Sequence, residues 1–288
     1  MKQGWIMRLR PFIGWAVFFF IAAVIAQSVP SLTGSYYFLK GKGLFAKGDY
    51  QGAAVAYERS VTSDPDFARG YIELGLSYNY MERYAQAEEA FKKAVSIHDD
   101  SCGQCGLGMV YHRQGKDEEA EKALRKATTL NPHDSCAFNQ LGRMYYKLDK
   151  YPEAIEAFQT DVRLRPNATS YHFLGNSHLY SNQFEKALTA YNEALRLNPK
   201  YYRVHVYMGH AYNNLRRWPE ARDAYRNAIK ADPDEIEARV GLAVTELELG
   251  NAREASEQYE HVRRLDTEWA DKLLAEMERR AVKAASQQ

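Results

Sequence analysis

Small and apolar residues recur along the chain with a period of 33 or 34 residues. Glycine stands at positions 41, 75, 108, 142, 175 and 209, with Ala243 in the seventh place. Alanine recurs in phase with it, at 53, 87, 120, 154, 187, 221 and 255. Proline closes five of the units, at 65, 132, 166, 199 and 233. A period of this length indicates one supersecondary unit repeated along the chain.

Each unit has the spacing of two helices joined by a turn. If the closing proline is position 32 of its unit, the first helix (helix A) carries its apolar residues at positions 4, 7, 8 and 11. These positions form one stripe on a helix. Glycine at position 8 and alanine at position 20 remove side chains where helix A crosses the second helix (helix B). Aromatic residues at positions 11 and 24 fill the gaps beside this crossing, so core packing explains most of the excess of tyrosine, of which the chain has 21. One helical pair cannot bury both of its faces, so the units are expected to stack.

This set of in-phase positions resembles the tetratricopeptide repeat family, whose unit is a helix–turn–helix of 34 residues. The resemblance implies an all-α fold, a right-handed α-solenoid of about seven repeats over residues 34–267. The first and last units depart most from the pattern, which is typical of terminal repeats. The departures are Lys40, Leu44 and Ser60 in the first unit, and Ala243, Glu246 and Thr267 in the last. Residues 268–288 are predicted to form a capping helix and a frayed tail.

The first 33 residues have a different character. Lys2, Arg8 and Arg10 precede an uncharged stretch, and Phe12–Val29 would span about 27 Å as a helix. Two interpretations stay open: a retained transmembrane anchor, or a signal peptide cleaved after Ala26. In both, the positive charge stays cytoplasmic and the repeats lie outside the cytoplasm, in the periplasm of a bacterium. The sequence therefore predicts a single-pass membrane protein with a cytoplasmic N-terminus.

Charge and motifs exclude several functions. The 38 Lys and Arg residues nearly balance the 37 Asp and Glu residues, which excludes a globally basic nucleic-acid binder. No phosphate-binding loop, nucleophile elbow, zinc-protease motif or dinucleotide fingerprint is found. We therefore expect a protein that is not an enzyme, needs no cofactor and binds protein partners.

The family resemblance implies that helix A lines the inner, partner-binding wall. Positions 2, 5, 9, 12 and 13 lie opposite the packed stripe, and in the first six units these 30 positions include no acid. Cations, amides and tyrosines there suit an extended partner segment that is acidic or ends in a carboxylate. A solvated face with chance charge is the alternative. The candidate groove residues are Arg69, Asn79, Tyr80, His112, Arg113, Asn139, Arg143, Lys147, His172, Asn176, Arg203, His210 and Asn213.

Two cysteines, Cys102 and Cys105, begin helix A of the third unit with the spacing C-x-x-C. Four interpretations of this pair stay open. The two thiols form a disulfide, stay reduced, act as an oxidoreductase pair, or bind zinc with Cys136 and a histidine (His98 or His133). Cys136 lies one repeat beyond Cys102, too far for an easy disulfide between them.

The predicted function is a membrane-tethered scaffold that binds protein partners and helps to assemble an envelope complex. Two alternatives remain. One is a thiol-redox or chaperone-like helper that uses Cys102 and Cys105. The other is a structural subunit that contacts a larger complex through its helix B face.

Overall fold

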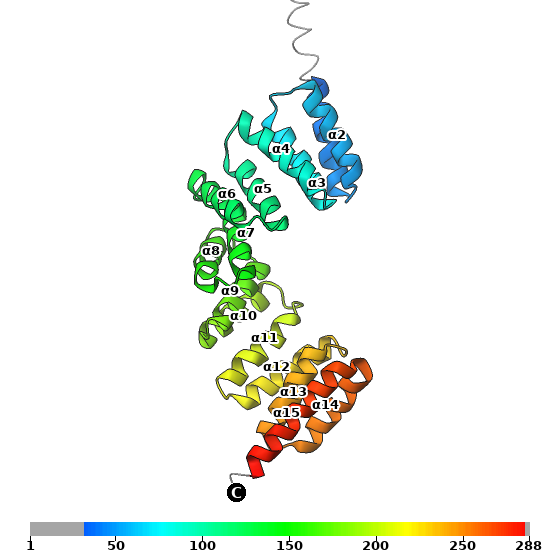
Figure 1. The fold of residues 1–288 in the computed structure, drawn as a ribbon, viewed down its shortest axis with the longest axis vertical. Coiled ribbons are helices and arrows are strands. Elements are labelled where there is room, and N and C mark those ends of the chain that lie inside the picture. Colours follow the sequence, from blue (N-terminus) through cyan, green and yellow to red (C-terminus); the bar gives the residue numbers. More distant parts are fainter. Residues whose placement is uncertain (1–31, 286–288) are drawn as a thin grey trace, which may run out of the picture. The chain divides into compact units, whose positions relative to one another are not determined.

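The structure is a computed structural model that describes residues 32–285. Every regular element in that range is an α-helix, and the helices follow one another in antiparallel pairs (Figure 1). The described chain divides into two compact units, one ending at Gln140 and the other beginning at Leu141. The predicted all-α architecture of stacked helix pairs is thereby confirmed.

In the first unit, helices A and B alternate, and each packs against the next. Helix α3 also contacts α5, so consecutive A helices adjoin one another. Helix α7 (Ser135–Lys147) contains the boundary between the units. The helices of the first unit are the one over residues 32–46, α2 (Tyr50–Ser63), α3 (Ala68–Tyr80), α4 (Tyr84–Ile97), α5 (Ser101–Arg113) and α6 (Asp117–Leu130).

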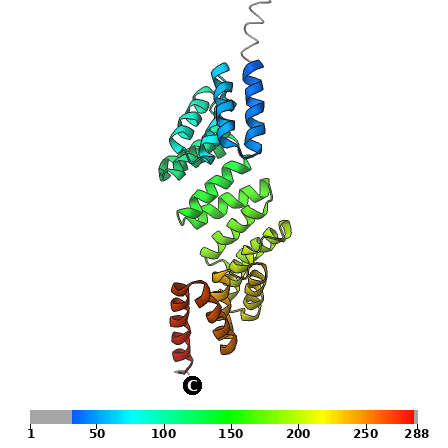
Figure 2. The ribbon, with the colours of Figure 1, turned by 90° about the vertical axis from the view of Figure 1, so that its right-hand side faces the viewer.

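The second unit continues the same alternation. Its A helices α9, α11 and α13 contact one another in sequence, and α15 packs beside α13 and α14 with Ala270 and Leu273 buried (Figure 2). Helix α15 thus covers the end of the last repeat. The helices of this unit are α8 (Tyr151–Leu164), α9 (Ala168–Tyr180), α10 (Phe184–Leu197), α11 (Arg203–Asn214), α12 (Trp218–Ala231), α13 (Ile236–Glu248), α14 (Ala252–Leu265) and α15 (Thr267–Ala285).

The glycine at position 8 sets the distance between the two helices of a repeat. A Cβ atom on Gly175 would lie 2.4 Å from a ring atom of Tyr191, and one on Gly209 would lie 2.5 Å from the ring of Tyr225. Both rings are fully buried. The ring of helix B therefore packs directly on the backbone of helix A, and a side chain at position 8 would separate them.

The residue at position 11 is paired with the residue five places later. In three repeats this is a tyrosine with a cation over its ring: Lys116 lies 5.5 Å from the Tyr111 centroid, Lys150 lies 5.7 Å from that of Tyr145, and Arg217 lies 4.9 Å from that of Tyr212. In the fifth and seventh repeats both members of the pair are replaced. His178 Nδ1 lies 3.2 Å from Gln183 Oε1, and the Asn251 amide donates to Glu246 at 2.7 Å.

Within residues 32–285, no helix has both the length and the apolar character needed to cross a membrane. The longest, α15, includes Glu268, Asp271 and Lys272, and charges of this kind are costly in hydrocarbon. This finding overturns the predicted single-pass membrane topology, with its cytoplasmic N-terminus and periplasmic body. The segment Phe12–Val29, on which that prediction rested, lies outside the described residues.

The packing predicts opposite effects for alanine at two helical glycines. Gly175→Ala should lower the free energy of unfolding by about 1–3 kcal/mol, because the new methyl group overlaps the buried Tyr191 ring. Gly43→Ala should raise it by about 0.5–1 kcal/mol, since nothing lies within 4 Å of the added atom. Urea denaturation measures both, and equal effects at the two sites would contradict the close-contact role of position 8.

Candidate functional site

The predicted groove residues of the first unit lie on the A helices. Asn79 in α3 reaches across to α5, where its amide contacts Met109 Sδ at 3.9 Å. Arg69 is exposed and lies 4.0 Å from Glu73 of its own helix. Tyr80 is 56% exposed and stacks on Tyr50. This face therefore combines helix-to-helix contacts with exposed rings and cations.

At the end of α5 the two predicted cationic positions differ. His112 Nδ1 lies 2.8 Å from Asp117 Oδ1 at the start of α6. Arg113 is exposed, and no carboxylate of the described residues lies within 4.0 Å of it. Of these two residues, Arg113 is the one that can bind a carboxylate of a partner.

The second unit places two predicted cations of α7 on its surface. The Arg143 guanidinium lies 5.1 Å from the ring centroid of Phe173, and Lys147 is exposed. Among described residues neither has a carboxylate within 4.0 Å. Asn139, half-buried in the same helix, belongs to the first unit. A contact with a ring face does not use the N–H donors of a guanidinium, so those of Arg143 can bind an anion.

His172 and Asn176 of α9 are buried, with exposed fractions of 8% and 2%. His172 Nδ1 lies 2.9 Å from the Tyr201 hydroxyl, while its buried Nε2 has no hydrogen-bond partner among the residues described. Asn176 Oδ1 accepts a hydrogen bond from the Tyr191 hydroxyl at 2.8 Å. Both side chains therefore form hydrogen bonds within the packed structure and do not present polar groups to solvent. Burial lowers the pKa of His172 to about 4.

Two side chains of α11 lie close to acids at the start of α13, the next A helix. Arg203 lies 3.9 Å from Glu235, and His210 Nε2 lies 3.0 Å from Glu237 Oε1. The His210 hydrogen bond lowers the pKa of Glu237. Asn213 is also occupied: its amide donates to the Tyr225 hydroxyl at 3.2 Å. The predicted positive character of repeat six is therefore largely neutralised, and the unpaired cations lie in earlier repeats.

The three cysteines lie in the first unit, and no disulfide joins them in the described part of the chain. Cys102 and Cys136 are exposed and Cys105 is buried. A hydrogen bond to Cys136, followed by burial, raises the pKa of Cys105. Burial, with the carboxylate of Asp100, raises that of Cys102. Raised pKa values disfavour the thiolate, which is the form that reacts with disulfides and binds metals. In the described range, no group of three or more His, Cys, Asp or Glu side chains is arranged to hold a metal.

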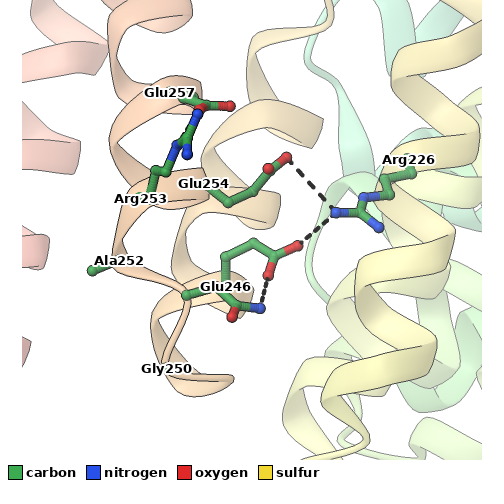
Figure 3. A pocket seen from close by; sticks show the side chains of 8 residues that line it. Arg226, Glu246, Gly250, Ala252, Arg253, Glu254 and Glu257 are labelled. Carbon is green, nitrogen blue, oxygen red and sulfur yellow. Dashed lines mark hydrogen bonds and ion pairs between the residues drawn. The ribbon is translucent and has the colours of Figure 1, made fainter.

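A pocket of about 720 Å³ lies in the last two repeats, between the B helices α12 and α14 (Figure 3). Glu246 of α13, at its base, is 1% exposed and stands where other repeats have tyrosine. Arg226 of α12 reaches it at 3.1 Å and also lies 3.7 Å from Glu254. The only sequence signal for this pocket was the acid that breaks the repeat pattern at position 11.

Loss of Arg226 should therefore destabilise the fold. Arg226→Ala leaves the buried Glu246 carboxylate with one hydrogen-bond donor fewer and should lower the free energy of unfolding by about 1–3 kcal/mol. The matched control is Arg253→Ala in the same pocket. That side chain is 94% exposed and pairs with Glu257 within α14, so its loss should cost about 0–0.5 kcal/mol. Chemical denaturation compares the two, and similar losses would contradict the role of Arg226.

His172 should make stability depend on pH. Its pKa is about 4 in the folded chain, against about 6.5 for an unperturbed histidine, so the unfolded state binds more protons between these values. The free energy of unfolding should fall as pH decreases from about 6.5 to 4, with a contribution of up to about 1.4 kcal/mol per pH unit. His172→Gln should make this slope shallower in urea denaturation at a series of pH values. An unchanged slope would show that His172 does not titrate in this way.

Sequence profiles of the tetratricopeptide repeat match the chain throughout its helical part. The matched ranges are residues 34–67, 66–133, 133–200, 174–236 and 216–276. Together they cover residues 34–276 without a gap.

Curated relatives match over limited parts of their own length. The small glutamine-rich tetratricopeptide repeat-containing protein 2 of Mycosarcoma maydis is 29% identical over 35% of this chain and 29% of its own. The peroxisomal targeting signal receptor of Kluyveromyces lactis is 24% identical over 71% of this chain and 37% of its own. The chain thus spans less than half the length of these relatives.

Solved structures share the fold. The Cut9–Hcn1 hetero-tetramer of the APC/C gives a TM-score of 0.63 at 21% identity, covering 79% of this chain and 45% of that one. The tetratricopeptide repeat protein YrrB, described as having an unusual peptide-binding site, gives 0.57 at 22% identity over 64% of this chain and 96% of its own. With its profile matches, helix pairs and in-phase glycines and aromatic rings, the chain belongs to the tetratricopeptide repeat family.

Proposed function

We propose that this chain is a non-enzymatic scaffold whose A-helix faces bind an extended, acidic segment of a partner protein. Tetratricopeptide repeat proteins serve as protein-interaction scaffolds and receptors, and the relatives named above include a targeting-signal receptor and a complex subunit. The partner of this chain is identified here only by its chemistry.

One observation carries the proposal. Four cations at groove positions 9 and 13 have no carboxylate within 4.0 Å among described residues: Arg113, Arg143 and Lys147 of the candidate groove, and Lys42, which occupies position 9 of the first repeat. Elsewhere on the helices, several exposed cations pair within their own helix, as Lys92 does with Glu88 and Arg196 with Glu193. Unpaired cations on the A-helix faces attract an acidic chain and align it by long-range forces.

The buried polar residues of the same face support a peptide ligand. Tyr191 and Tyr225 of the B helices extend their hydroxyls toward A-helix amides, at Asn176 and Asn213. These bonds fix the wall against which a partner segment would lie. A rigid, pre-arranged surface loses less conformational entropy when it binds than a flexible one.

A second candidate is a structural subunit that docks through its B-helix side. The pocket between α12 and α14 favours it, because Arg226, Glu254 and Glu257 line a polar recess on that side (Figure 3). The raised pKa values of Cys102 and Cys105 argue against the thiol-redox alternative.

Charge reversal on the A-helix face tests the proposal. Arg113→Glu, Arg143→Glu and Lys147→Glu in one variant should reduce partner recovery in a pull-down about tenfold or more, because the acidic segment is then repelled. Recovery by the unaltered chain should also fall as salt is raised, since exposed charges are screened.

The control reverses three exposed cations of the B helices, Lys92, Arg196 and Arg253. It changes net charge equally and should leave recovery unchanged. Circular dichroism checks that both variants fold. If the A-face variant recovers as much partner as the original chain, the proposal is wrong.

A further inference from the structure

Three aromatic rings gather in the first unit where helix A ends and helix B begins. Tyr50 and Tyr80 stack nearly parallel, with centroids 4.7 Å apart and planes inclined by 15°. Phe45 meets both edge-on, at 5.1 Å and 5.3 Å. Tyr80 remains 56% exposed, so the pair presents an open ring face.

The second unit contains the same arrangement. Tyr151 and Tyr180 stack with centroids 5.3 Å apart and planes inclined by 20°. Tyr146 meets Tyr151 at 5.9 Å and 63°, and Tyr180 at 6.1 Å and 53°. Tyr180 is 49% exposed. Two stacked tyrosines with a third ring across them thus occur once in each unit.

The two clusters occupy equivalent repeat positions: 12 and 17 of one repeat and 13 of the next. The clusters are Phe45, Tyr50 and Tyr80, and Tyr146, Tyr151 and Tyr180. The other repeats break the set with a polar residue, such as Arg113, Lys147, Asn214 or Glu248 at position 13. Repeats therefore fold without these rings, and packing does not explain why the set recurs.

A cation lies one turn before each cluster. Lys42 and Arg143 both occupy position 9 of the helix that carries the first ring. Lys42 Nζ lies 6.0 Å from the Phe38 centroid and the Arg143 guanidinium 5.1 Å from that of Phe173. In the described part of the chain, no carboxylate is within 4.0 Å of either. Each aromatic platform thus has its own unpaired positive charge.

We propose that the two platforms are equivalent binding sites for one short motif, a proline-rich segment in polyproline II conformation that carries an acidic residue. This inference rests on the proposed function and names the partner chemistry. Proline rings pack on exposed aromatic faces, and the carbonyls of a polyproline II chain, which have no internal partners, accept hydrogen bonds from tyrosine hydroxyls. In the second platform this donor is Tyr180 or Tyr146, because the Tyr151 hydroxyl donates to Asp149 at 2.6 Å. The acid of the motif pairs with Lys42 or Arg143. The cations at the platforms fit an acidic motif and disfavour a basic one.

The partner then carries the motif twice, or two partner chains bind at once. Each platform lies within one compact unit, so each site is complete in itself.

Isothermal titration calorimetry with the full chain tests this inference. The probe is the blocked hexapeptide Pro-Pro-Asp-Pro-Pro-Glu, and the comparison probe has lysine in place of both acids. We expect two equivalent sites per chain for the acidic peptide and binding at least about tenfold weaker for the lysine peptide. Tyr80→Ala and Tyr180→Ala should each leave one site of unchanged affinity, and the double variant should leave none.

Tyr36→Ala is the matched control, because Tyr36 is also an exposed tyrosine of the first unit (62%) but lies outside both clusters. It should keep two sites. Thermal unfolding checks that every variant folds. Absence of saturable binding, a single site in the unaltered chain, or loss of a site in Tyr36→Ala would overturn the inference. Tighter binding of a thymidine decanucleotide than of the acidic peptide would overturn it too, since stacked tyrosines also accept bases.

The outcome separates this inference from the proposed function. If the peptide does not bind but charge reversal still abolishes partner recovery, the platform inference is wrong and the scaffold function stands. If charge reversal has no effect as well, the A-helix face is not the binding surface.

Discussion

The contact between a glycine of helix A and an aromatic ring of helix B sets the geometry of five of the repeats. At Gly175 and Gly209 the ring of the second helix packs on the backbone of the first, with no room for a Cβ atom. Because the helices approach this closely, their two outer faces diverge, and each pair must stack on the next to bury its apolar surface. The neighbouring A helices α9, α11 and α13 follow from that stacking.

The same contact connects the core with the surface on which we place function. At two of the tyrosines the hydroxyl passes beside helix A and meets polar residues: Tyr191 reaches Asn176, and Tyr225 reaches Asn213 and His210. Core rings therefore orient the groove-wall side chains. A substitution in helix B at these positions would be expected to change the A-helix face without contacting a partner.

Much of the fold could be predicted because the repeat is redundant. Seven in-phase glycine or alanine positions locate the helices, and the observed pairs follow the predicted period. Whether a given side chain is buried, exposed or paired was harder to predict. His172 and Asn176 share the wheel positions of exposed groove residues, yet rings contributed by neighbouring helices bury them. Arg203 pairs with Glu235, which caps the next A helix, α13, so this pairing does not follow from the residues of one helix face. Similarly, each aromatic platform combines residues of two repeats, so the pattern of one helix face does not predict it.

The central claim is that partner binding occurs on the A helices. Hydrogen–deuterium exchange of the full chain, alone and with a recovered partner, measures this directly. We predict slower amide exchange on binding at the C-terminal ends of α3, α7 and α9, with α4, α10 and α12 unchanged. Protection confined to the B helices, and above all to α12 and α14 around Arg226, would contradict the account and favour a subunit that docks through its opposite face.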